Sequence, residues 1–174
     1  MDHFVSDLKQ IRERARSHME TGAVTESYKA DRVEVLNEVL ATETVCVLRY
    51  KRHFFMARGI AAESVKSEFL QHANDEQQHC DRIAGRIIQL NGAPNFNPQG
   101  LSSRSHSEYQ EGSNLIEMIK EDLVAERVAV QSYAEIAHWL AENDPTTRRL
   151  IEKILKMEEE HADDLANMLT KAAS

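Results

Sequence analysis

Two Glu-x-x-His pairs are the residues of this sequence best suited to chemistry. Glu76 and His79 occur in the stretch DEQQHC, and Glu158 and His161 occur in MEEEHA. Residues three apart lie on one face of a helix, so each pair would direct a carboxylate and an imidazole toward one point, and both groups bind metal ions. One such pair is weak evidence, because a charged helical sequence produces it by chance. A second pair makes chance a much poorer explanation.

Four long segments have the apolar periodicity of amphipathic helices, and each carries an acidic residue within its apolar stripe. Apolar residues recur at spacings of three and four, which is typical of a helix surface that faces a core. A glutamate stands in each stripe where a helix bundle would hold leucine. The stripes read Leu36, Leu40, Glu43, Val47, Tyr50 and Phe54; Phe69, Ala73, Glu76, Cys80, Ile83 and Ile87; Ile119, Asp122 or Leu123, Glu126, Val130, Tyr133, Ala137 and Leu140; and Ile151, Ile154, Glu158, His161, Leu165 and Met168.

Glycine and proline residues mark the limits of these segments. The segments run over about residues 31–58, 62–90, 113–142 and 144–171. Each would form about 40 Å of helix. Asp31 and Glu34 have the spacing of a capping box at the start of the first helix, and Asp144 followed by Pro145 is a typical start for the fourth. We therefore predict an all-α fold built on a four-helix bundle.

The four stripe glutamates are predicted to lie at one height in this bundle. Two residues of an antiparallel hairpin lie level when they are equidistant from the turn. Glu43 and Glu76 are equidistant from the break after Gly59. Glu126 and Glu158 are equidistant from residue 142, beside the break between the last two helices. All four carboxylates would then lie about 24 Å from their loops, near the middle of the bundle.

The connection over about residues 91–112 is much longer than the loops that join antiparallel bundle helices. Some 20 extended residues span about 66 Å, so the second and third helices can run parallel while the chain returns outside the bundle. The stretch LSSRSHSEY leaves room in this crossover for a short extra helix. The bundle with its crossover would thus occupy residues 31–171.

Residues 1–30 are expected to form an additional amphipathic helix and a linker ahead of the bundle. The helix would end near Thr21, and we expect it to dock on the bundle or on a neighbouring subunit. Its apolar stripe consists of Phe4, Leu8, Ile11, Ala15 and Met19.

The pairs and the stripe glutamates together give six candidate metal ligands: Glu43, Glu76, His79, Glu126, Glu158 and His161. Four carboxylates and two neutral imidazoles carry four negative charges, which two divalent cations balance. This oxygen-rich set suits Fe or Mn, whereas a structural zinc site would favour thiolates. Carboxylates also bridge metals, so we expect two ions about 3.5 to 4 Å apart. The alternative is a metal-free structural bundle in which the acids align by coincidence.

Composition excludes several other classes of protein. The 174 residues suit one domain, and 6 Gly and 3 Pro leave little for strands and turns. A net charge of −8 disfavours nucleic acid as a specific partner. Two cysteines make no disulfide scaffold, the first residues hold no apolar leader, and no apolar run reaches the roughly 18 residues of a membrane span. We therefore expect a cytoplasmic protein.

The motifs taken together resemble the ferritin-like di-iron superfamily, and most closely the bacterioferritins. The likeness covers about residues 33–170 and rests on LNEVLATETVCVLRY, HANDEQQHCDRI, EDLVAERVAVQSY and KMEEEHADDL. The iron ligands that it implies are Glu43 and Glu126 as terminal ligands, Glu76 and Glu158 as bridges, and His79 and His161 with one on each iron. Tyr50, seven residues after Glu43, matches a tyrosine beside the family's site, and core packing with a buried hydroxyl is its alternative.

This resemblance implies a ferroxidase that oxidises Fe(II) with oxygen or hydrogen peroxide at a di-iron site within one chain. It also implies that Fe(III) mineral is stored in a hollow shell, with two irons per chain at the site and Mn or Zn as substitutes. The alternatives are a non-storage di-iron peroxidase similar to the rubrerythrins or an oxygen-activating oxidase. Rubrerythrins carry an extra glutamate that would fall at Ala129.

Departures from the bacterioferritin pattern shape two further expectations. Gln77 stands where bacterioferritins carry the methionine that binds haem, so haem is not expected. The sequence ends 13 residues after His161, too early for the additional C-terminal helix of 24-subunit shells. Dps-like relatives combine a bacterioferritin-type site with a smaller shell, so we expect a homo-dodecamer rather than a 24-mer.

The remaining polar residues receive simpler interpretations. Cys46 and Cys80 would be displaced in opposite axial directions, so we expect small buried side chains without a mutual disulfide, with redox participation as the alternative. Single histidines are expected at the surface or an interface rather than at the metals: His53, His72, His106 and His138. Acidic residues beside the ligands are expected to be solvated, with cation delivery as the alternative: Asp75, Glu159 and Glu160.

Overall fold

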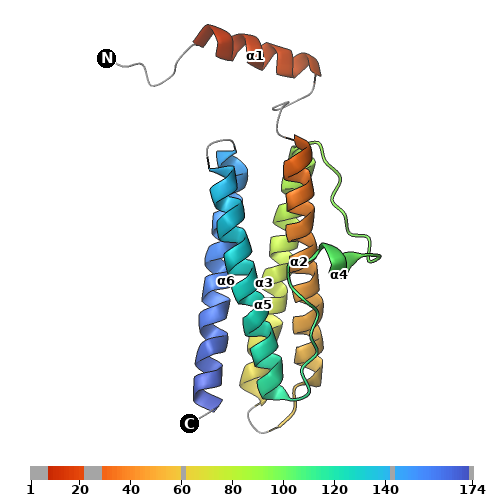
Figure 1. Ribbon diagram of the computed structural model, residues 1–174, viewed down its shortest axis with the longest axis vertical. Coiled ribbons are helices and arrows are strands. Elements are labelled where there is room, and N and C mark those ends of the chain that lie inside the picture. Colours follow the sequence, from red (N-terminus) through yellow and green to blue (C-terminus); the bar gives the residue numbers. More distant parts are fainter. Residues whose placement is uncertain (1–7, 22–28, 60–61, 142–143, 173–174) are drawn as a thin grey trace, which may run out of the picture.

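The computed structural model describes residues 8–21, 29–59, 62–141 and 144–172, which form six helices and no strands. The helices are α1 (Leu8–Thr21), α2 (Lys29–Met56), α3 (Ala62–Gln89), α4 (Leu101–Arg104), α5 (Leu115–Leu140) and α6 (Pro145–Ala172). Helices α2, α3, α5 and α6 form the bundle (Figure 1). The predicted four-helix bundle with a long crossover and an extra N-terminal helix is confirmed.

The bundle consists of two antiparallel hairpins, α2 with α3 and α5 with α6 (Figure 1). Packing is most extensive within each hairpin, while α2 contacts α5 and α3 contacts α6 across the bundle. Helices α3 and α5 run in the same direction, because the crossover returns the chain along the outside of α2 (Figure 1). Helix α4 lies in this crossover, within the stretch that leaves room for a short helix.

Side chains of α2 hold the crossover against the bundle. The Asn37 side chain accepts a hydrogen bond from the Asn95 backbone N–H at 2.7 Å, and the Thr42 hydroxyl accepts one from the His106 backbone N–H at 2.9 Å. A Cβ atom at Gly92 would lie 2.5 Å from a methyl group of Val33, so glycine allows the chain to pass close to α2. The crossover is therefore an ordered layer on one face of the bundle.

Helix ends agree with the predicted ends within two residues. Asp144 caps α6 as expected, because its Oδ1 accepts the Thr147 backbone N–H at 3.0 Å. Asp31 does not cap α2, which begins at Lys29, and this prediction was wrong. Asp31 instead lies in the first turn, where a carboxylate still stabilises the positive end of the helix dipole.

The apolar interior is divided into two clusters. One includes Leu36, Ile83 and Ile151, and the other includes Phe69 and Leu165. Most residues of the predicted stripes are buried, and the exceptions that are only partly buried are Phe54, Val130 and Met168. Burial of a large aliphatic or aromatic side chain contributes about 1.5 to 3 kcal/mol, so these clusters can support a polar layer between them.

Helix α1 lies in the segment predicted to contain an amphipathic helix. Its stripe residues Ile11 and Ala15 are exposed, so the described residues do not show the expected docking on the bundle. Phe4 and the side chains of Leu8 and Met19 lie outside the described part. Docking on a neighbouring subunit stays a prediction.

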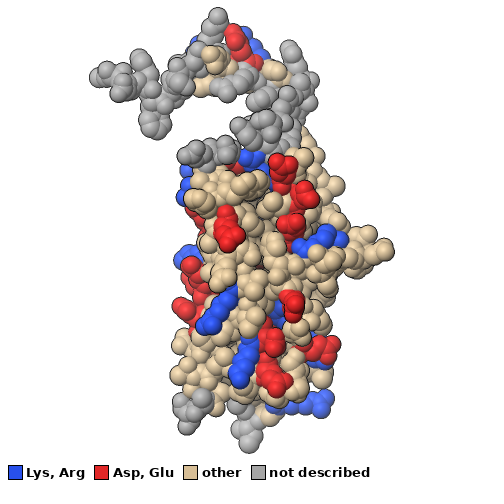
Figure 2. Space-filling view, viewed as in Figure 1, with Lys and Arg blue, Asp and Glu red and all other residues tan. Residues whose placement is uncertain are grey.

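None of the helices in the described part of the chain combines the length and apolar character of a membrane span. On the face of the molecule in Figure 2, acidic and basic residues are interspersed and form no single basic patch.

Candidate metal centre

The six predicted ligands lie between the two apolar clusters, with one glutamate from each bundle helix. Helix α2 supplies Glu43, α3 supplies Glu76 and His79, α5 supplies Glu126, and α6 supplies Glu158 and His161. All six residues are buried, and none is more than 3% exposed. The structure therefore brings together every residue of the predicted set.

Ligand atoms from these residues form two overlapping groups. The first contains Glu43, Glu76, His79 and Glu158, and the second contains Glu76, Glu126, Glu158 and His161. In each group, one ligand atom from every residue lies within 4.8 Å of the others. Glu76 and Glu158 belong to both groups, and this is the geometry of two adjacent cation sites that share two carboxylates.

Each histidine directs its Nδ1 atom at the shared carboxylates. His79 Nδ1 lies 3.0 Å from Glu158 Oε1, 3.1 Å from Glu43 Oε2 and 3.3 Å from Glu76 Oε2. His161 Nδ1 lies 3.2 Å from Glu76 Oε1 and 3.5 Å from Glu158 Oε2. One imidazole nitrogen therefore belongs to each of the two groups.

Several buried atoms at the centre have no hydrogen-bond partner among the described residues. They are Glu76 Oε1, Glu126 Oε2, both carboxylate oxygens of Glu158 and both ring nitrogens of His161. Some of these atoms approach one another at ion-pair distance but without the geometry of a hydrogen bond. A buried unpaired polar group costs about 1 to 3 kcal/mol, and a charged one costs more. Two divalent cations would satisfy these atoms, and carboxylate with imidazole donors fit iron or manganese.

Protonation at the centre is strongly perturbed by burial and by the crowded carboxylates. Burial and the neighbouring Glu76 carboxylate raise the pKa of Glu43 to about 8. Burial, Glu76 and Glu158 raise the pKa of Glu126 well above its usual value. Burial would lower the pKa of His161, but the nearby Glu158 and Glu76 carboxylates raise it to about 10. Without metal the centre therefore retains protons, which bound cations would displace.

Glu76 differs from Glu43 and Glu126 in the direction of its pKa shift. Burial and the Glu158 carboxylate act to raise its pKa, but the close approach of Glu43, His161 and His79 outweighs them and lowers the pKa of Glu76. Glu76 therefore keeps its negative charge more readily than Glu43 and Glu126 do.

Two tyrosines donate hydrogen bonds to glutamates of the centre. The Tyr50 hydroxyl of α2 donates to Glu126 of α5, and the Tyr133 hydroxyl of α5 donates to Glu43 of α2. Tyr50 is also packed in an apolar cluster. It therefore lies beside the centre, as one interpretation expected, and is also a core residue with a buried hydroxyl, as the other expected. We expected Tyr133 only in the core. Tyr133 follows Glu126 by seven residues, as Tyr50 follows Glu43, and this repeated spacing was the signal available in the sequence.

Beyond the centre, His53 is fully buried, so its expected place at the surface or an interface was wrong. Its Nδ1 lies 2.8 Å from Asp122 Oδ2, and Arg49 Nε donates to Asp122 Oδ1 at 2.8 Å. All three side chains are completely buried. Arg49 also donates to the backbone carbonyl of Glu108 at 3.0 Å, so the network joins α2, α5 and the crossover beside Tyr50.

The same expectation was wrong for His72, which is also fully buried. Its ring stacks on the ring of His161 with centroids 4.0 Å apart, and its Nδ1 lies 3.2 Å from the Tyr50 hydroxyl. Burial and His161 lower the pKa of His72 to about 3, so its imidazole is neutral. Of the other single histidines, His106 is partly buried and His138 is exposed.

Cys46 and Cys80 are buried and are not joined to each other. Cys46 Sγ accepts a hydrogen bond from Arg49 at 3.4 Å, and Cys80 Sγ lies 3.6 Å from the Thr44 hydroxyl. Burial raises the pKa of Cys80 to about 12 and that of Cys46 well above its usual value, so both are thiols of low reactivity.

Other residues singled out in the sequence lie around the centre. Asp75 Oδ2 is 3.6 Å from His161 Nε2, whereas Glu159 and Glu160 are exposed. Gln77 is exposed and donates to Asp81 at 3.2 Å. Ala129, where a rubrerythrin would place its extra glutamate, is 2% exposed.

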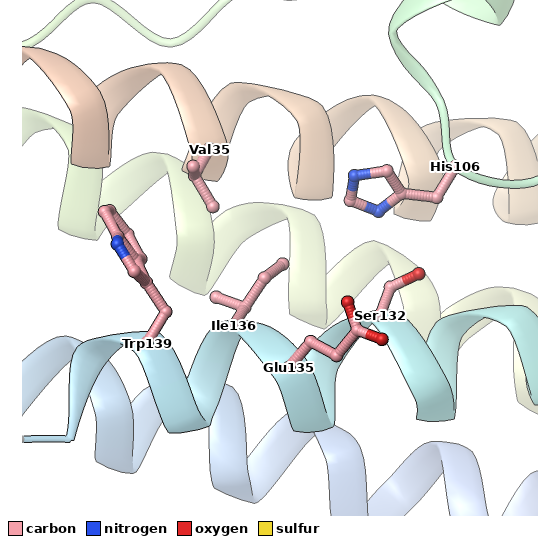
Figure 3. Close-up of a pocket in the computed structure, with 6 residues that line it drawn as sticks. All are labelled: Val35, His106, Ser132, Glu135, Ile136 and Trp139. Atoms are coloured by element: carbon pink, nitrogen blue, oxygen red, sulfur yellow. The ribbon is translucent and has the colours of Figure 1, made fainter.

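A surface pocket lies apart from this centre, between α2, α5 and the crossover (Figure 3). Its lining residues are Val35, His106, Ser132, Glu135, Ile136 and Trp139. None of the six candidate ligands lines it.

Comparison with known proteins gives consistent results for sequence and structure. Residues 33–174 match the ferritin-like domain family. The chain is 32% identical over 149 residues to the nutrient stress-induced DNA-binding protein of a Nostoc species, which covers 83% of this chain and 80% of that protein. It is 30% identical over 140 residues to the bacterioferritin of Mycobacterium leprae, which covers 80% of this chain and 84% of that protein.

A similar solved structure is that of the bacterioferritin-related protein of Bacteroides fragilis, described as a dodecameric thioferritin. It matches with a TM-score of 0.81 and 27% identity, over 92% of this chain and 95% of that protein. The resemblance to ferritin-like proteins, and to bacterioferritins and Dps-like proteins among them, is confirmed.

Proposed function

Because the chain belongs to the ferritin-like domain family, we propose that it is an iron-storage ferroxidase. In this proposal the protein takes up Fe(II), oxidises it at a di-iron centre within one chain, and retains the Fe(III) as mineral inside a hollow shell. The observation that carries the proposal is the pair of four-residue groups that share Glu76 and Glu158. Two adjacent cation sites with common carboxylates favour chemistry that uses two metal ions together.

The ligand roles follow from membership of the two groups. Glu76 and Glu158 would bridge the ions. Glu43 and His79 would complete one site, and Glu126 and His161 would complete the other. Four carboxylates and two neutral imidazoles would balance two Fe(II) ions, with Mn or Zn as substitutes. Binding requires the protons held by Glu43, Glu126 and the histidines to leave, so uptake of metal would be accompanied by release of protons.

The reaction balances as a two-electron step. Two Fe(II) ions each lose one electron, and one hydrogen peroxide takes up both electrons and two protons to give two waters; oxygen would take up the same two electrons and two protons to give hydrogen peroxide. The protein's part is to hold the ions side by side in a water-poor interior and to accept or supply protons. The Tyr50 and Tyr133 hydroxyls would fix the orientation of Glu126 and Glu43, and Tyr50 would also take part in catalysis.

Storage distinguishes this function from its alternatives. A non-storage peroxidase or an oxygen-activating oxidase would use the same centre without retaining mineral, and a structural bundle would bind no iron. We favour storage because the bacterioferritin similarity covers 80% of the chain. We also propose a homo-dodecamer, since the Bacteroides fragilis relative is described as dodecameric and matches over 92% of the chain.

Nucleic acid and haem are not part of the proposal. The DNA binding named for the Nostoc relative belongs to that protein. The net charge here is −8, and the face in Figure 2 has no single basic patch to bind a polyanion. The exposed amide of Gln77 is not a haem ligand. A cytoplasmic location stays a prediction.

The proposal is tested by loading the protein with Fe(II) without oxygen, adding hydrogen peroxide or oxygen, and counting iron per chain after gel filtration. The expected result is rapid oxidation followed by retention of many irons per chain. About two irons per chain with continued turnover would favour the peroxidase or oxidase. If the protein neither oxidised nor retained iron, the structural bundle would be the remaining interpretation.

A further inference from the structure

Ligand-type side chains continue along α3 and α6 beyond the dinuclear centre. On α3, His72 and Glu68 precede Glu76 at intervals of four residues, and on α6 Asp164 follows His161 by three. These intervals keep the side chains on one face of each helix. Since α3 and α6 are antiparallel and in contact, His72 stacks on His161, and the next turn brings Glu68 and Asp164 together.

Glu68, His72 and Asp164 form a compact group of their own. One ligand atom from each of the three residues lies within 4.8 Å of the others. The group extends from the interior to the surface, because His72 is fully buried, Glu68 is partly buried and the Asp164 side chain is 55% exposed. Both carboxylates line a surface depression, whose lining also includes the single cation of Lys171. The two carboxylates outnumber this one cation, so the depression favours a positively charged ligand.

His72 presents an unused lone pair to this group. The single proton of the Tyr50 hydroxyl goes to Glu126, so the Tyr50 oxygen can only accept from His72. His72 Nδ1 therefore carries the ring proton, and Nε2 carries a lone pair. Nε2 is buried, lacks a hydrogen-bond partner in the described residues, and lies 3.9 Å from Asp164 Oδ2, beyond hydrogen-bond distance. A metal-binding histidine has this arrangement, with its second nitrogen donating to a fixed acceptor.

We propose that Glu68, His72 and Asp164 bind a divalent cation, and that this third site passes Fe(II) from the surface to the dinuclear centre. Two carboxylates and a neutral imidazole are ligands for Fe(II), Mn(II) and Co(II). A path continues inward, because His72, Glu126 and His161 also place one ligand atom each within 4.8 Å of the others. The binding of the cation stands independently, whereas delivery to the centre rests on the proposed function.

The binding claim is tested by anaerobic equilibrium dialysis of the full chain against Co(II), with cobalt and protein both quantified. Three ions per chain are expected for the wild type. Asp164→Asn and Glu68→Gln should each lower the affinity for the third ion by at least about tenfold. Loss of a residue that only hydrogen-bonds to a metal ligand already lowers metal affinity by this factor, and the loss of a ligand should cost no less. Asp163→Asn is the matched control, because Asp163 is an exposed neighbour on α6 that lies outside the group, and it should bind three ions as the wild type does.

The outcomes separate this inference from the proposed function. Two ions per chain, bound equally by the wild type, Asp164→Asn and Glu68→Gln, would overturn the third site and leave the dinuclear centre standing. One ion per chain that is lost in Asp164→Asn would support the third site and overturn the dinuclear centre. Glu126→Gln should weaken binding of the two inner ions and leave binding of the outer ion unchanged, which is the opposite of the result expected for Asp164→Asn.

The delivery claim has its own measurement. At Fe(II) concentrations below one ion per chain, stopped-flow absorbance should show oxidation at least about tenfold slower in Asp164→Asn than in Asp163→Asn, in line with the weaker outer site. Equal rates in the two variants would overturn delivery through this group.

Discussion

Replacement of Glu43 by glutamine should stabilise the metal-free protein at neutral pH and weaken its binding of metal. Glutamine has nearly the same size, and its amide oxygen can still accept the hydrogen bond of the Tyr133 hydroxyl. The charge is what changes. Burial and Glu76 raise the pKa of Glu43 to about 8, so the folded wild type holds a proton at pH 7 that the unfolded chain releases.

The size of the effect follows from the folded pKa of about 8 and the ordinary value of 4.5. Between these values the folded state binds the extra proton, so the free energy of unfolding falls by about 1.4 kcal/mol for each pH unit as pH rises. The destabilisation is thus under about 1 kcal/mol at pH 5 and about 3 kcal/mol at pH 7. The glutamine variant lacks this pH-dependent destabilisation. It also loses the charged contact of 3.1 Å between Glu43 and His79, which costs about 1.5 to 3 kcal/mol.

The net gain for Glu43→Gln is therefore about 1 kcal/mol at pH 7, or about 2 to 4 °C in Tm for a chain of this size. The gain should increase up to about pH 8 and become a loss near pH 5. Urea unfolding of chelator-treated wild type and variant at equal protein concentration measures it. Glu160→Gln is the control, since Glu160 is exposed and forms an ion pair with the exposed Lys156, and it should stay within about 0.5 kcal/mol of the wild type.

Added metal should reverse the order of stability. Mn(II) at 100 times its Kd stabilises the wild type by about 2.7 kcal/mol per independent site, and the variant, which lacks one ligand, gains less. A difference between Glu43→Gln and the wild type that does not change from pH 5 to pH 8 would refute the assignment of Glu43 as a buried, protonated carboxyl.

Three further predictions concern activity, cofactor and assembly. Glu126→Ala should abolish rapid Fe(II) oxidation while circular dichroism shows an intact helical fold, whereas Glu160→Ala should oxidise iron at the parent rate; an active Glu126→Ala protein would make the assigned site wrong. Haem should not co-purify, because Gln77 replaces the expected methionine, and a Soret band at about half a haem per chain would contradict this. Light scattering should give about 238 kDa, the mass of twelve 19.8 kDa chains, and a value near 475 kDa would indicate 24 chains instead.

The helices and the level of the candidate ligands could be predicted from the sequence because both depend on local spacing. Apolar periodicity identified the core-facing side of each bundle helix, and an acid on that side must be buried. Equal distances from a turn then placed Glu43 beside Glu76 and Glu126 beside Glu158. These inferences need only helix geometry and short loops, which vary little between proteins.

The contacts around the ligands could not be predicted, because they depend on how helices from different hairpins are rotated against each other. Asp122 joins Arg49 and His53 across the bundle, more than 65 positions away in sequence. His72 looks like a single surface histidine until α6 packs against α3 and covers it with His161. Asp31 has the spacing of a cap, but α2 begins two residues earlier, at Lys29, so Asp31 lies inside its first turn.

Anomalous diffraction from crystals loaded with Mn(II) in the absence of oxygen tests the central claim most directly. At the dinuclear centre of each chain the account predicts two anomalous peaks, about 3.5 to 4 Å apart, between the carboxylates of Glu76 and Glu158. One ion should contact Glu43 and His79, and the other should contact Glu126 and His161. A single peak between these helices, or no peak within reach of Glu76 and Glu158, would contradict it.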